Sequence, residues 1–532
     1  MGEARRWMYT GVSIAGGMIA ALTLFVWHEH AQVGHIGFPL DDSWIHLQMA
    51  RNLSLGEGMY FNSGEPVSAS SAPLWTLLLA ALHLLPWDIV LAVKASAVAL
   101  LLGVGLVTAA VGRSLGLSPM WAAGAGMVLT LSPRMVWGGL SGMEIPLYTL
   151  LATAGVWLHI RSFGSSPSLV SSALFAGASL ARPDCLVLLP LALLDRWRRG
   201  SLASVWRDYR KHLLLFAAIL APAVTFNLAT IGRLLPNTYY AKVGDFGLLG
   251  ALHDGNYIQV LKTLGYYPLQ QLQELVQLAV SENLVVACFI PIGLLHLVSQ
   301  CSGGGKSKPG AQSAIFLLIL VGYPLIRGLL APFHGPLFQH GRYVGFLFPL
   351  FILVGVVGMR QAIFQFTRLG DFPRVRRIAT WGPPLLWGML ALNMVGLQLQ
   401  YARIYAANVA DIEHLHVAMG QWLARNTEED AVVATHDIGA IGYFSGRRVV
   451  DTSGLITPEI LPYLRPGQKA DIGVLKFLER ERPDYLVVIP TWYPDLVRRE
   501  DLFESIYEIV LGARSIAAGD RLVAYRTRWS GG

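Results

Sequence analysis

Residues 38–66 read FPLDDSWIHLQMARNLSLGEGMYFNSGEP and follow closely on an apolar run at residues 9–27. Two adjacent carboxylates, Asp41 and Asp42, therefore lie near a segment of membrane-spanning length. An acid at the centre of a bilayer costs on the order of 3 kcal/mol, and neighbouring carboxylates repel each other. Such a pair is retained where a site needs a base, a metal ligand or a partner for a cation. The structural alternative is an exposed pair that caps a helix over residues 43–54.

The composition of the whole chain predicts a membrane protein around this segment. Of 532 residues, 54% are hydrophobic and 14% are charged, whereas soluble globular proteins carry about 25% charged residues. This surplus of apolar residues excludes the possibility that the whole chain is a soluble enzyme. The net charge of +7 is explained by basic cytoplasmic loops, so we expect no nucleic-acid partner.

About eleven apolar runs are long enough, or nearly so, to cross a bilayer. They are residues 9–27, 89–112, 118–132, 144–160, 167–181, 183–196, 211–231, 282–300, 312–331, 342–358 and 378–400. The run at 71–86 is shorter and contains prolines at both ends. We predict that it forms a re-entrant or interfacial helix and does not cross.

Basic residues predict the orientation of these spans, because cytoplasmic loops are enriched in Lys and Arg. Arg and Lys concentrate at residues 196–211, 302–310 and 359–377. With these loops inside, the N-terminus is cytoplasmic and the C-terminus is outside. The polar loops 28–70 and 232–281 then share the extracytoplasmic face with the turns at 133–145 and 332–343. We therefore expect a multi-pass protein of the inner (plasma) membrane with its active face outside.

The composition changes near residue 401, where charged residues return. We divide the chain into a membrane part, residues 1–400, and a tail, residues 401–532. Short β-like runs in the tail alternate with helix-like stretches. These runs are residues 431–435, 447–451, 484–490 and 521–525. The alternation predicts a small extracytoplasmic α/β domain.

Further charged residues fall on the same predicted face. Glu144 lies in the motif SGMEIP at the outer end of a span, where an acid also complements the dipole of a helix. Arg182 and Asp184 share a tight turn between two apolar runs, and the simplest reading is that they pair with each other.

Two more motifs add basic residues. PNTYYAK, residues 236–242, carries Lys242 with Tyr239 and Tyr240, and HGRY, residues 340–343, carries His340 and Arg342. Lysine and arginine suit a phosphate near the lipid headgroups. The alternatives are ordinary interfacial tyrosines and an arginine that snorkels to lipid phosphates.

Acids and bases gathered at one membrane face match the needs of glycosyl transfer from a lipid phosphate. The carboxylate of an acidic residue acts as a base and takes the proton of the acceptor, and cations stabilise the leaving phosphate. Motifs for other chemistries are absent from the sequence, including a Walker A loop, an HExxH pair and a GxSxG elbow.

The chain resembles the GT-C glycosyltransferases. The stretch DDSWIHLQMARNLSLGEGMYFNSGEPVSASSAPLW, residues 41–75, is similar to the first outer loop of the subgroup that contains mycobacterial decaprenyl-phosphoarabinose-dependent arabinofuranosyltransferases. Further matches run in order along the chain. They are SGMEIPLY at 141–148, LARPD at 180–184, PNTYYAK at 236–242, GRY at 341–343 and HDIGAIGYFSGRRVVD at 436–451.

This resemblance implies an inverting transferase with a polyprenyl-monophosphate sugar donor and an extracytoplasmic glycan, lipid or protein acceptor. The catalytic base maps onto Asp41 or Asp42, and we favour Asp41 slightly. Residues for the donor phosphate and sugar are then Glu144, Arg182, Lys242, His340 and Arg342. Residues for the substrate or acceptor are Trp44, Tyr239, Tyr240, His436 and Asp437. No cofactor or metal is required, and a divalent cation at the aspartate pair stays open.

The sequence departs from the family pattern at Gln48-Met49 and at Ser68-Ala69-Ser70. The second region is expected to touch the acceptor or the sugar, so arabinofuranose stays one option beside a mannosyl or aminoarabinosyl donor. In the tail, His436 and Asp437 either bind the acceptor or form a turn in which Asp437 accepts from backbone amides. A non-catalytic lipid transporter is the alternative of another class. We expect Asp41→Asn and Asp42→Asn to differ, with one variant losing turnover.

Overall fold

The computed structural model describes residues 3–163, 165–198, 200–243, 248–253, 255–302, 313–332, 334–368, 373–464 and 469–529. Every apolar run predicted from the sequence coincides with a helix in these ranges. The lysines of the glycine-rich turn predicted at 302–310 lie outside the described residues.

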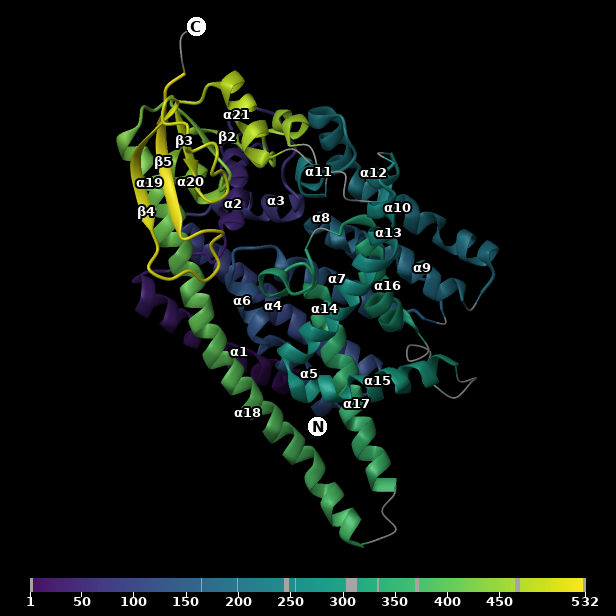
Figure 1. Cartoon of the computed structure of the whole chain (residues 1–532). Helices are drawn as coiled ribbons and strands as arrows, with labels where there is room; N and C mark the ends of the chain where they lie inside the picture. Colours follow the sequence, from purple (N-terminus) through teal and green to yellow (C-terminus); the bar gives the residue numbers. More distant parts are fainter. Residues whose placement is uncertain are drawn as a thin grey trace.

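The regular elements in the described membrane part are all helices (Figure 1). The long ones are α1 (Glu3–Val33), α4 (Ile89–Ser114), α7 (Ile145–Arg161), α10 (Leu202–Ile231), α14 (Tyr267–Glu282), α15 (Leu284–Ser302), α16 (Ile315–Leu330), α17 (Phe348–Arg368) and α18 (Pro373–Asp411). The shorter ones are α2 (Asp41–Ser54), α3 (Pro73–His83), α5 (Pro119–Thr130), α6 (Pro133–Leu140), α8 (Leu169–Ala181), η1 (Pro183–Val187), α9 (Leu188–Trp197), α11 (Asn237–Val243), α12 (Leu248–His253), α13 (Tyr257–Leu261), η3 (Lys262–Tyr266), η5 (Phe338–Gly341) and η6 (Gly345–Leu347).

Within the described ranges, five helices are long and apolar enough to cross a membrane. They cover Trp7–Val33, Ile89–Ser114, Val205–Ile231, Leu284–Ser302 and Gly345–Thr367. Helix α3, the run predicted not to cross, has 11 residues and is about 17 Å long, whereas the hydrocarbon core is about 30 Å thick. The chain is a predominantly helical membrane protein.

Helices α15 and α17 pack with their backbones in close approach, because glycines line the contact. A methyl group at Gly293 would meet the carbonyl oxygen of Val354, and one at Gly358 would meet the carbonyl oxygen of Phe289. Neither obstacle is a side chain that can rotate away, so a larger residue must push the helices apart.

We expect Gly358→Ala to lower the stability of the protein by about 1–3 kcal/mol, since overpacking forces the backbone to shift. The measurement is the apparent Tm of the purified protein in detergent. Gly388→Ala in α18 is the matched control, because nothing lies within 4 Å of the added methyl group. Equal Tm values for the two variants would contradict the close packing.

Helix α18 joins the membrane part to the tail without a break (Figure 1). It continues through a π-helical turn, η7 (Ile412–Val417), into α19 (Ala418–Asn426). The composition change at residue 401 therefore falls inside a continuous helix and not in a linker.

The tail contains a five-stranded sheet in the order β2-β1-β3-β5-β4. Its strands are β1 (Val432–Thr435), β2 (Arg448–Asp451), β3 (Tyr485–Val488), β4 (Phe503–Val510) and β5 (Arg521–Thr527). Strands β1, β2 and β3 are parallel, and β5 is antiparallel to β3 and β4. Three further helices complete the tail, α20 (Gly439–Ser445), η8 (Pro458–Tyr463) and α21 (Ala470–Glu481). The sequence predicted four of these strands and missed β4.

The segment at residues 28–70, which contains α2, holds the tail in place. Helix α2 packs on α20, and Arg51 donates to the carbonyl oxygen of Tyr443 at 3.1 Å while its guanidinium lies over the Tyr443 ring. The Asn62 side chain bonds to both the carbonyl oxygen and the N–H of Val449, at 2.9 and 3.0 Å. Asn62 thus pairs with the outer edge of β2 as a further strand would.

Candidate active site

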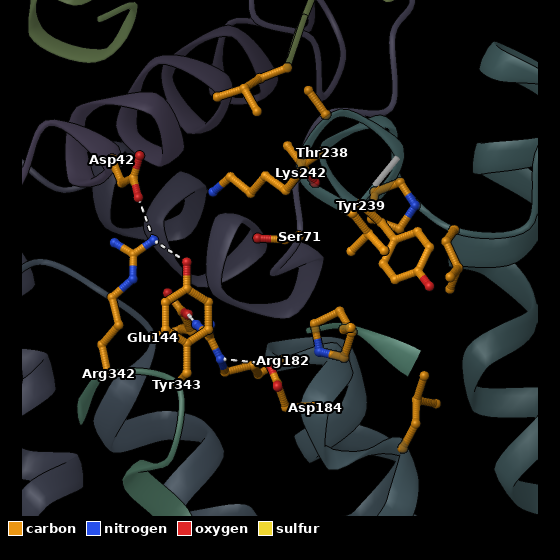
Figure 2. Close-up of a pocket in the computed structure, with 18 of the residues that line it drawn as sticks. Asp42, Ser71, Glu144, Arg182, Asp184, Thr238, Tyr239, Lys242, Arg342 and Tyr343 are labelled. Atoms are coloured by element: carbon orange, nitrogen blue, oxygen red, sulfur yellow. Dashed lines mark hydrogen bonds and ion pairs between the residues drawn. The ribbon is translucent and has the colours of Figure 1, made fainter. Parts of the chain in front are cut away.

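A cavity of about 410 Å³ lies where α2, η1, α11 and α16 meet the segment before α17 (Figure 2). Its charged lining residues are Asp42, Glu144, Arg182, Asp184, Lys242, Arg327 and Arg342. One wall is apolar and includes Leu186, Val187, Leu235, Ile326 and Leu330. Leu455 and Ile456 of the tail complete the lining. The cavity therefore combines a charged end with a hydrocarbon-like wall.

Asp42 and Arg342 form the central ion pair of the charged end. Nη2 of Arg342 lies 2.5 Å from Oδ2 of Asp42 and 3.2 Å from the hydroxyl oxygen of Tyr343. The backbone of this segment is fixed by Tyr148, whose hydroxyl donates to the carbonyl oxygen of Arg342 at 2.5 Å and accepts from the N–H of Gly345 at 2.8 Å. Contacts to both the backbone and the guanidinium therefore hold Arg342 in place.

The surroundings of Asp42 keep it ionised. Burial by itself would raise the pKa of its carboxyl, but the positive charges of Arg342 and Lys242 outweigh burial and hold that pKa well below its ordinary value. Lys242 extends from α11 towards Asp42 and Arg342 (Figure 2). Burial lowers the pKa of the neighbouring His46, so this imidazole stays neutral near pH 7.

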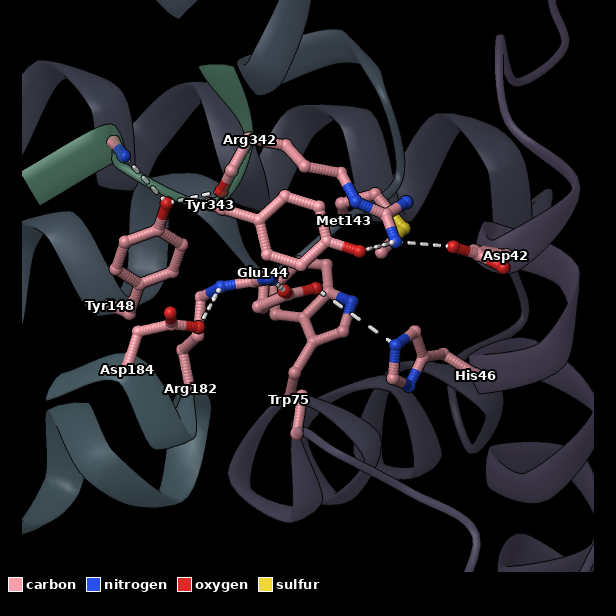
Figure 3. A network of polar contacts seen from close by, with 12 residues as sticks. Asp42, His46, Trp75, Met143, Glu144, Tyr148, Arg182, Asp184, Arg342 and Tyr343 are labelled. Carbon is pink, nitrogen blue, oxygen red and sulfur yellow. Dashed lines mark hydrogen bonds and ion pairs between the residues drawn. The ribbon is translucent and has the colours of Figure 1, made fainter. Parts of the chain in front are cut away.

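Arg182 lies below Tyr343 in a second layer of charges (Figure 3). Its guanidinium bonds to Glu144, lies 3.1 Å from Oδ2 of Asp184 and sits over the Tyr343 ring. The predicted pairing of Arg182 with Asp184 is therefore present. Because two carboxylates already surround Arg182, it is less available to a phosphate than the cations beside Asp42.

Arg327 is a lining residue that the sequence reasoning missed. It lies in α16, bonds to Asp184 and stacks over Tyr343 at 4.8 Å. A lone arginine inside a strongly apolar helix is the signal that could have revealed it, because such a charge is retained mainly at functional sites. With Arg327 included, four cations and three carboxylates line the described cavity, so its charge favours an anionic ligand.

Among the predicted donor and acceptor residues, Glu144, Arg182, Lys242, Arg342 and Tyr239 line the cavity. Tyr240 instead stacks with Arg233 at 4.5 Å. His340 does not line the cavity. Its Nε2 lies 3.2 Å from Oδ1 of Asn408, and its ring packs on Trp137. Both His340 and Gln339 have positive φ angles, 60° and 43°. The backbone therefore turns at these two residues.

Asp41 does not line the cavity either. Its carboxylate accepts from the backbone N–H groups of Gly439 and Ala440 at 2.8 and 2.7 Å, at the start of α20. Burial raises the pKa of Asp41 to about 6. Trp44 is also buried against the tail, packed on Phe38, Tyr443 and Phe444. The structure thus separates the two adjacent aspartates, with Asp42 facing the cavity and Asp41 holding the tail.

His436 and Asp437 form a polar cluster with His416 beside Asp41. Asp437 lies 3.0 Å from Nε2 of His416 and 3.3 Å from Nε2 of His436. Burial would raise the pKa of Asp437, but His436 and His416 lower it to about 2. Neither His436 nor Asp437 lines the described cavity, and Asp437 does not accept from the backbone amides of the turn; Asp41 does.

The two carboxylates of the aspartate pair bond to different partners, Asp42 to Arg342 and Asp41 to the backbone N–H of Gly439. In the described ranges, no group of three or more His, Cys, Asp or Glu residues is arranged to hold a metal ion.

Asn237 positions the tail residues of the cavity. Its side-chain amide donates to the carbonyl oxygens of Gly454 and Leu455 at 2.7 and 2.9 Å, and its backbone N–H donates to Ser68 at 2.7 Å. One buried residue thus ties α11, the first outer loop and the tail together. In the sequence region that departs from the family pattern, Ala69 lines the cavity, as does the following Ser71.

Comparisons with solved structures define the fold. The chain is similar to the oligosaccharyltransferase AglB of Archaeoglobus fulgidus in complex with an inhibitory peptide and a dolichol-phosphate, with a TM-score of 0.59, 10% identity and coverage of 98% of this chain and 75% of that one. It is also similar to ArnT of Cupriavidus metallidurans, with a TM-score of 0.56, 14% identity and 98% coverage of each chain. ArnT bound to undecaprenyl phosphate gives a TM-score of 0.55 at 12% identity, with coverage of 96% of this chain and 97% of that one. The chain shares the overall fold of AglB and ArnT.

Sequence comparison also finds a similar protein. The chain is 28% identical over 410 residues to the terminal β-(1→2)-arabinofuranosyltransferase of Mycobacterium tuberculosis strain ATCC 25618 / H37Rv. The match covers 70% of this chain and 61% of the relative's length. Residues 402–529 match a domain of unknown function, DUF8728. The resemblance to GT-C arabinofuranosyltransferases noted in the sequence is confirmed.

Proposed function

We propose that the chain is an inverting glycosyltransferase that moves a sugar from a polyprenyl-monophosphate donor to an extracytoplasmic acceptor. The observation that carries this proposal is the cavity itself. It places a carboxylate, Asp42, beside two cations, Arg342 and Lys242, and continues into an apolar wall. A lipid-linked phosphate needs both of these surfaces.

The apolar wall between η1, α11 and α16 accommodates the start of the polyprenyl chain. The donor phosphate then lies at Lys242 and Arg342, since an arginine fork and an ammonium group together neutralise a phosphate. The sugar fills the space beside Met143 and Ile456. This assignment leaves the Arg182, Arg327, Glu144 and Asp184 layer as a structural base for Tyr343.

In the reaction, Asp42 accepts the proton of an acceptor hydroxyl while the hydroxyl oxygen attacks the anomeric carbon. The bond from that carbon to the phosphate oxygen breaks, and its electron pair stays on the phosphate. Arg342 and Lys242 stabilise the second negative charge that develops there. Attack opposite the leaving phosphate inverts the configuration.

We further propose that the site faces the outside of the inner (plasma) membrane, with the tail on the same side. The basic loops at 196–211 and 359–377 support this orientation. The 28% identical relative supports arabinofuranose as the sugar. The acceptor is an extracytoplasmic glycan, lipid or protein, and the reaction proceeds without a cofactor or metal.

We expect the purified protein to consume one member of a panel of polyprenyl-phosphate sugars, with decaprenyl-phosphoryl arabinofuranose the leading candidate. The panel includes the mannosyl and aminoarabinosyl lipids, and mass spectrometry of the lipid products reads the transfer. Consumption of the mannosyl or aminoarabinosyl lipid alone would correct the sugar. Neither binding nor consumption of any donor would contradict the proposal and favour the non-catalytic transporter.

A further inference from the structure

Asp42 covers Arg342 in the cavity. The Asp42 side chain is 28% exposed, whereas the Arg342 side chain is 4% exposed. The single ion pair between them uses Nη2, and neither Nε nor Nη1 of Arg342 has a hydrogen-bond partner. The guanidinium therefore has unused donors, but these are buried, and its bonded nitrogen is shared with a carboxylate that is more exposed than the arginine.

The two roles assigned to this pair exclude each other while the pair is intact. A carboxylate that accepts from an arginine at 2.5 Å is a poor base, because proton transfer would break its best interaction. An arginine whose Nη2 bonds to a carboxylate cannot offer a phosphate a fork that uses Nη2. While the ion pair is intact, the site is therefore not arranged for transfer.

We infer that Asp42 and the donor phosphate compete for Arg342, so that donor binding takes Arg342 from Asp42 and releases Asp42 as the base. This inference rests on the proposed function. It makes the order of events compulsory: the donor binds first, and only then can the acceptor hydroxyl lose its proton.

Several contacts make this exchange feasible. Arg342 is held by its backbone through Tyr148 and by its guanidinium over the Tyr343 ring, so the fork stays in place when its partner changes. Asp42 lies in the first turn of α2, where a change of side-chain rotamer moves the carboxylate without moving the helix.

The titratable groups around Asp42 come from every surrounding element. They are His46 on its own helix, Lys242 on α11, Arg342 and Tyr343 before α17, His334, and Asp437 in the tail. Arg342 and Lys242 are the cations that lower the pKa of Asp42 most. When the phosphate engages both cations, its negative charge offsets theirs near Asp42, and the basicity of Asp42 rises.

The chemistry balances without a further reactant. The donor is a phosphodiester with one negative charge, and its phosphate gains a second charge as the bond to the anomeric carbon breaks. The proton of the acceptor hydroxyl goes to Oδ of Asp42 in the same step. Arg342 is then on the phosphate, where the new charge appears, and Asp42 is neutral.

The test is direct binding of undecaprenyl phosphate to the full-length protein in detergent, without turnover. We expect Asp42→Asn to bind this lipid about tenfold more tightly than the wild type, because the competing carboxylate is gone. Asp41→Asn is the matched control, since it removes the same charge one residue away, outside the cavity. It should bind the lipid as the wild type does.

A double-mutant cycle separates competition for Arg342 from a general change in charge. In an Arg342→Gln background, Asp42→Asn should no longer increase the affinity. A gain that persists in this background, an equal gain in Asp41→Asn, or an unchanged or weaker affinity in Asp42→Asn would each overturn the inference.

The binding measurement also distinguishes this inference from the proposed function. Undecaprenyl phosphate binding without a gain in Asp42→Asn would leave the donor site standing and remove only the competition. No binding to the wild type or to any variant, with thermal unfolding showing each protein to be folded, would overturn both.

Discussion

Asp42→Asn should lower kcat for sugar transfer by about 10³-fold, because general-base catalysis contributes about 10²–10⁴-fold. Asparagine keeps the size of the side chain and one hydrogen-bond acceptor, but it cannot take the proton of the acceptor hydroxyl. The donor KM should not rise with this change, since the variant also removes the competitor of the phosphate at Arg342. Initial rates with the donor selected from the panel, over a range of donor concentrations, measure both quantities.

The control is Asp41→Asn, the same substitution one residue earlier. Asp41 accepts from two backbone N–H groups of the tail, so its replacement should loosen that contact and lower the Tm while most of the turnover is kept. Loss of turnover in Asp41→Asn with full turnover in Asp42→Asn would reverse the assignment of the base.

The second large effect is expected at Arg342. Arg342→Gln should lower kcat/KM for the donor by about 10²–10³-fold, because the charge that develops on the leaving phosphate loses a preorganised cation. Arg342→Lys should restore part of the rate, since lysine supplies the charge but not the planar fork. The same steady-state assay measures these variants.

Arg233→Gln is the matched control, because Arg233 also lies in the outer loop but stacks on Tyr240 outside the cavity. It should leave kcat/KM close to the wild-type value. Equal kcat/KM values for Arg342→Gln and the wild type would place the phosphate elsewhere, for example at Arg327.

Much of the fold could be predicted from the sequence, because apolar runs of membrane-spanning length become helices whatever their neighbours are. Strand β4 was missed for a physical reason. It lies at the edge of the sheet, and most of its side chains are partly or fully exposed, so its sequence, FESIYEIV, lacks a clear apolar face.

The residue types of the candidate site could be predicted from the sequence. Their arrangement in space could be predicted less well. Asp41 and Asp42 are adjacent in the first turn of α2, and successive side chains on a helix point about 100° apart. Adjacent side chains can therefore meet different surroundings, and the sequence does not say which aspartate faces the cavity; the slight preference for Asp41 as the base stays a prediction, and Asp42 is the one that lines the cavity. His340 and Arg342 diverge in the same way, because positive φ angles at residues 339–341 turn the chain between them.

The pairing of Asn62 with Val449 bears on whether the tail is autonomous. Strand β2 is an outer strand of the sheet, and an open strand edge is a template for aggregation. A fragment cut at residue 402, where the DUF8728 match starts, would begin in the middle of α18 and lose the cover that Asn62 gives to that edge. The tail therefore matches a family model by itself, yet one edge of its sheet is covered by a side chain that lies 387 residues earlier in the sequence.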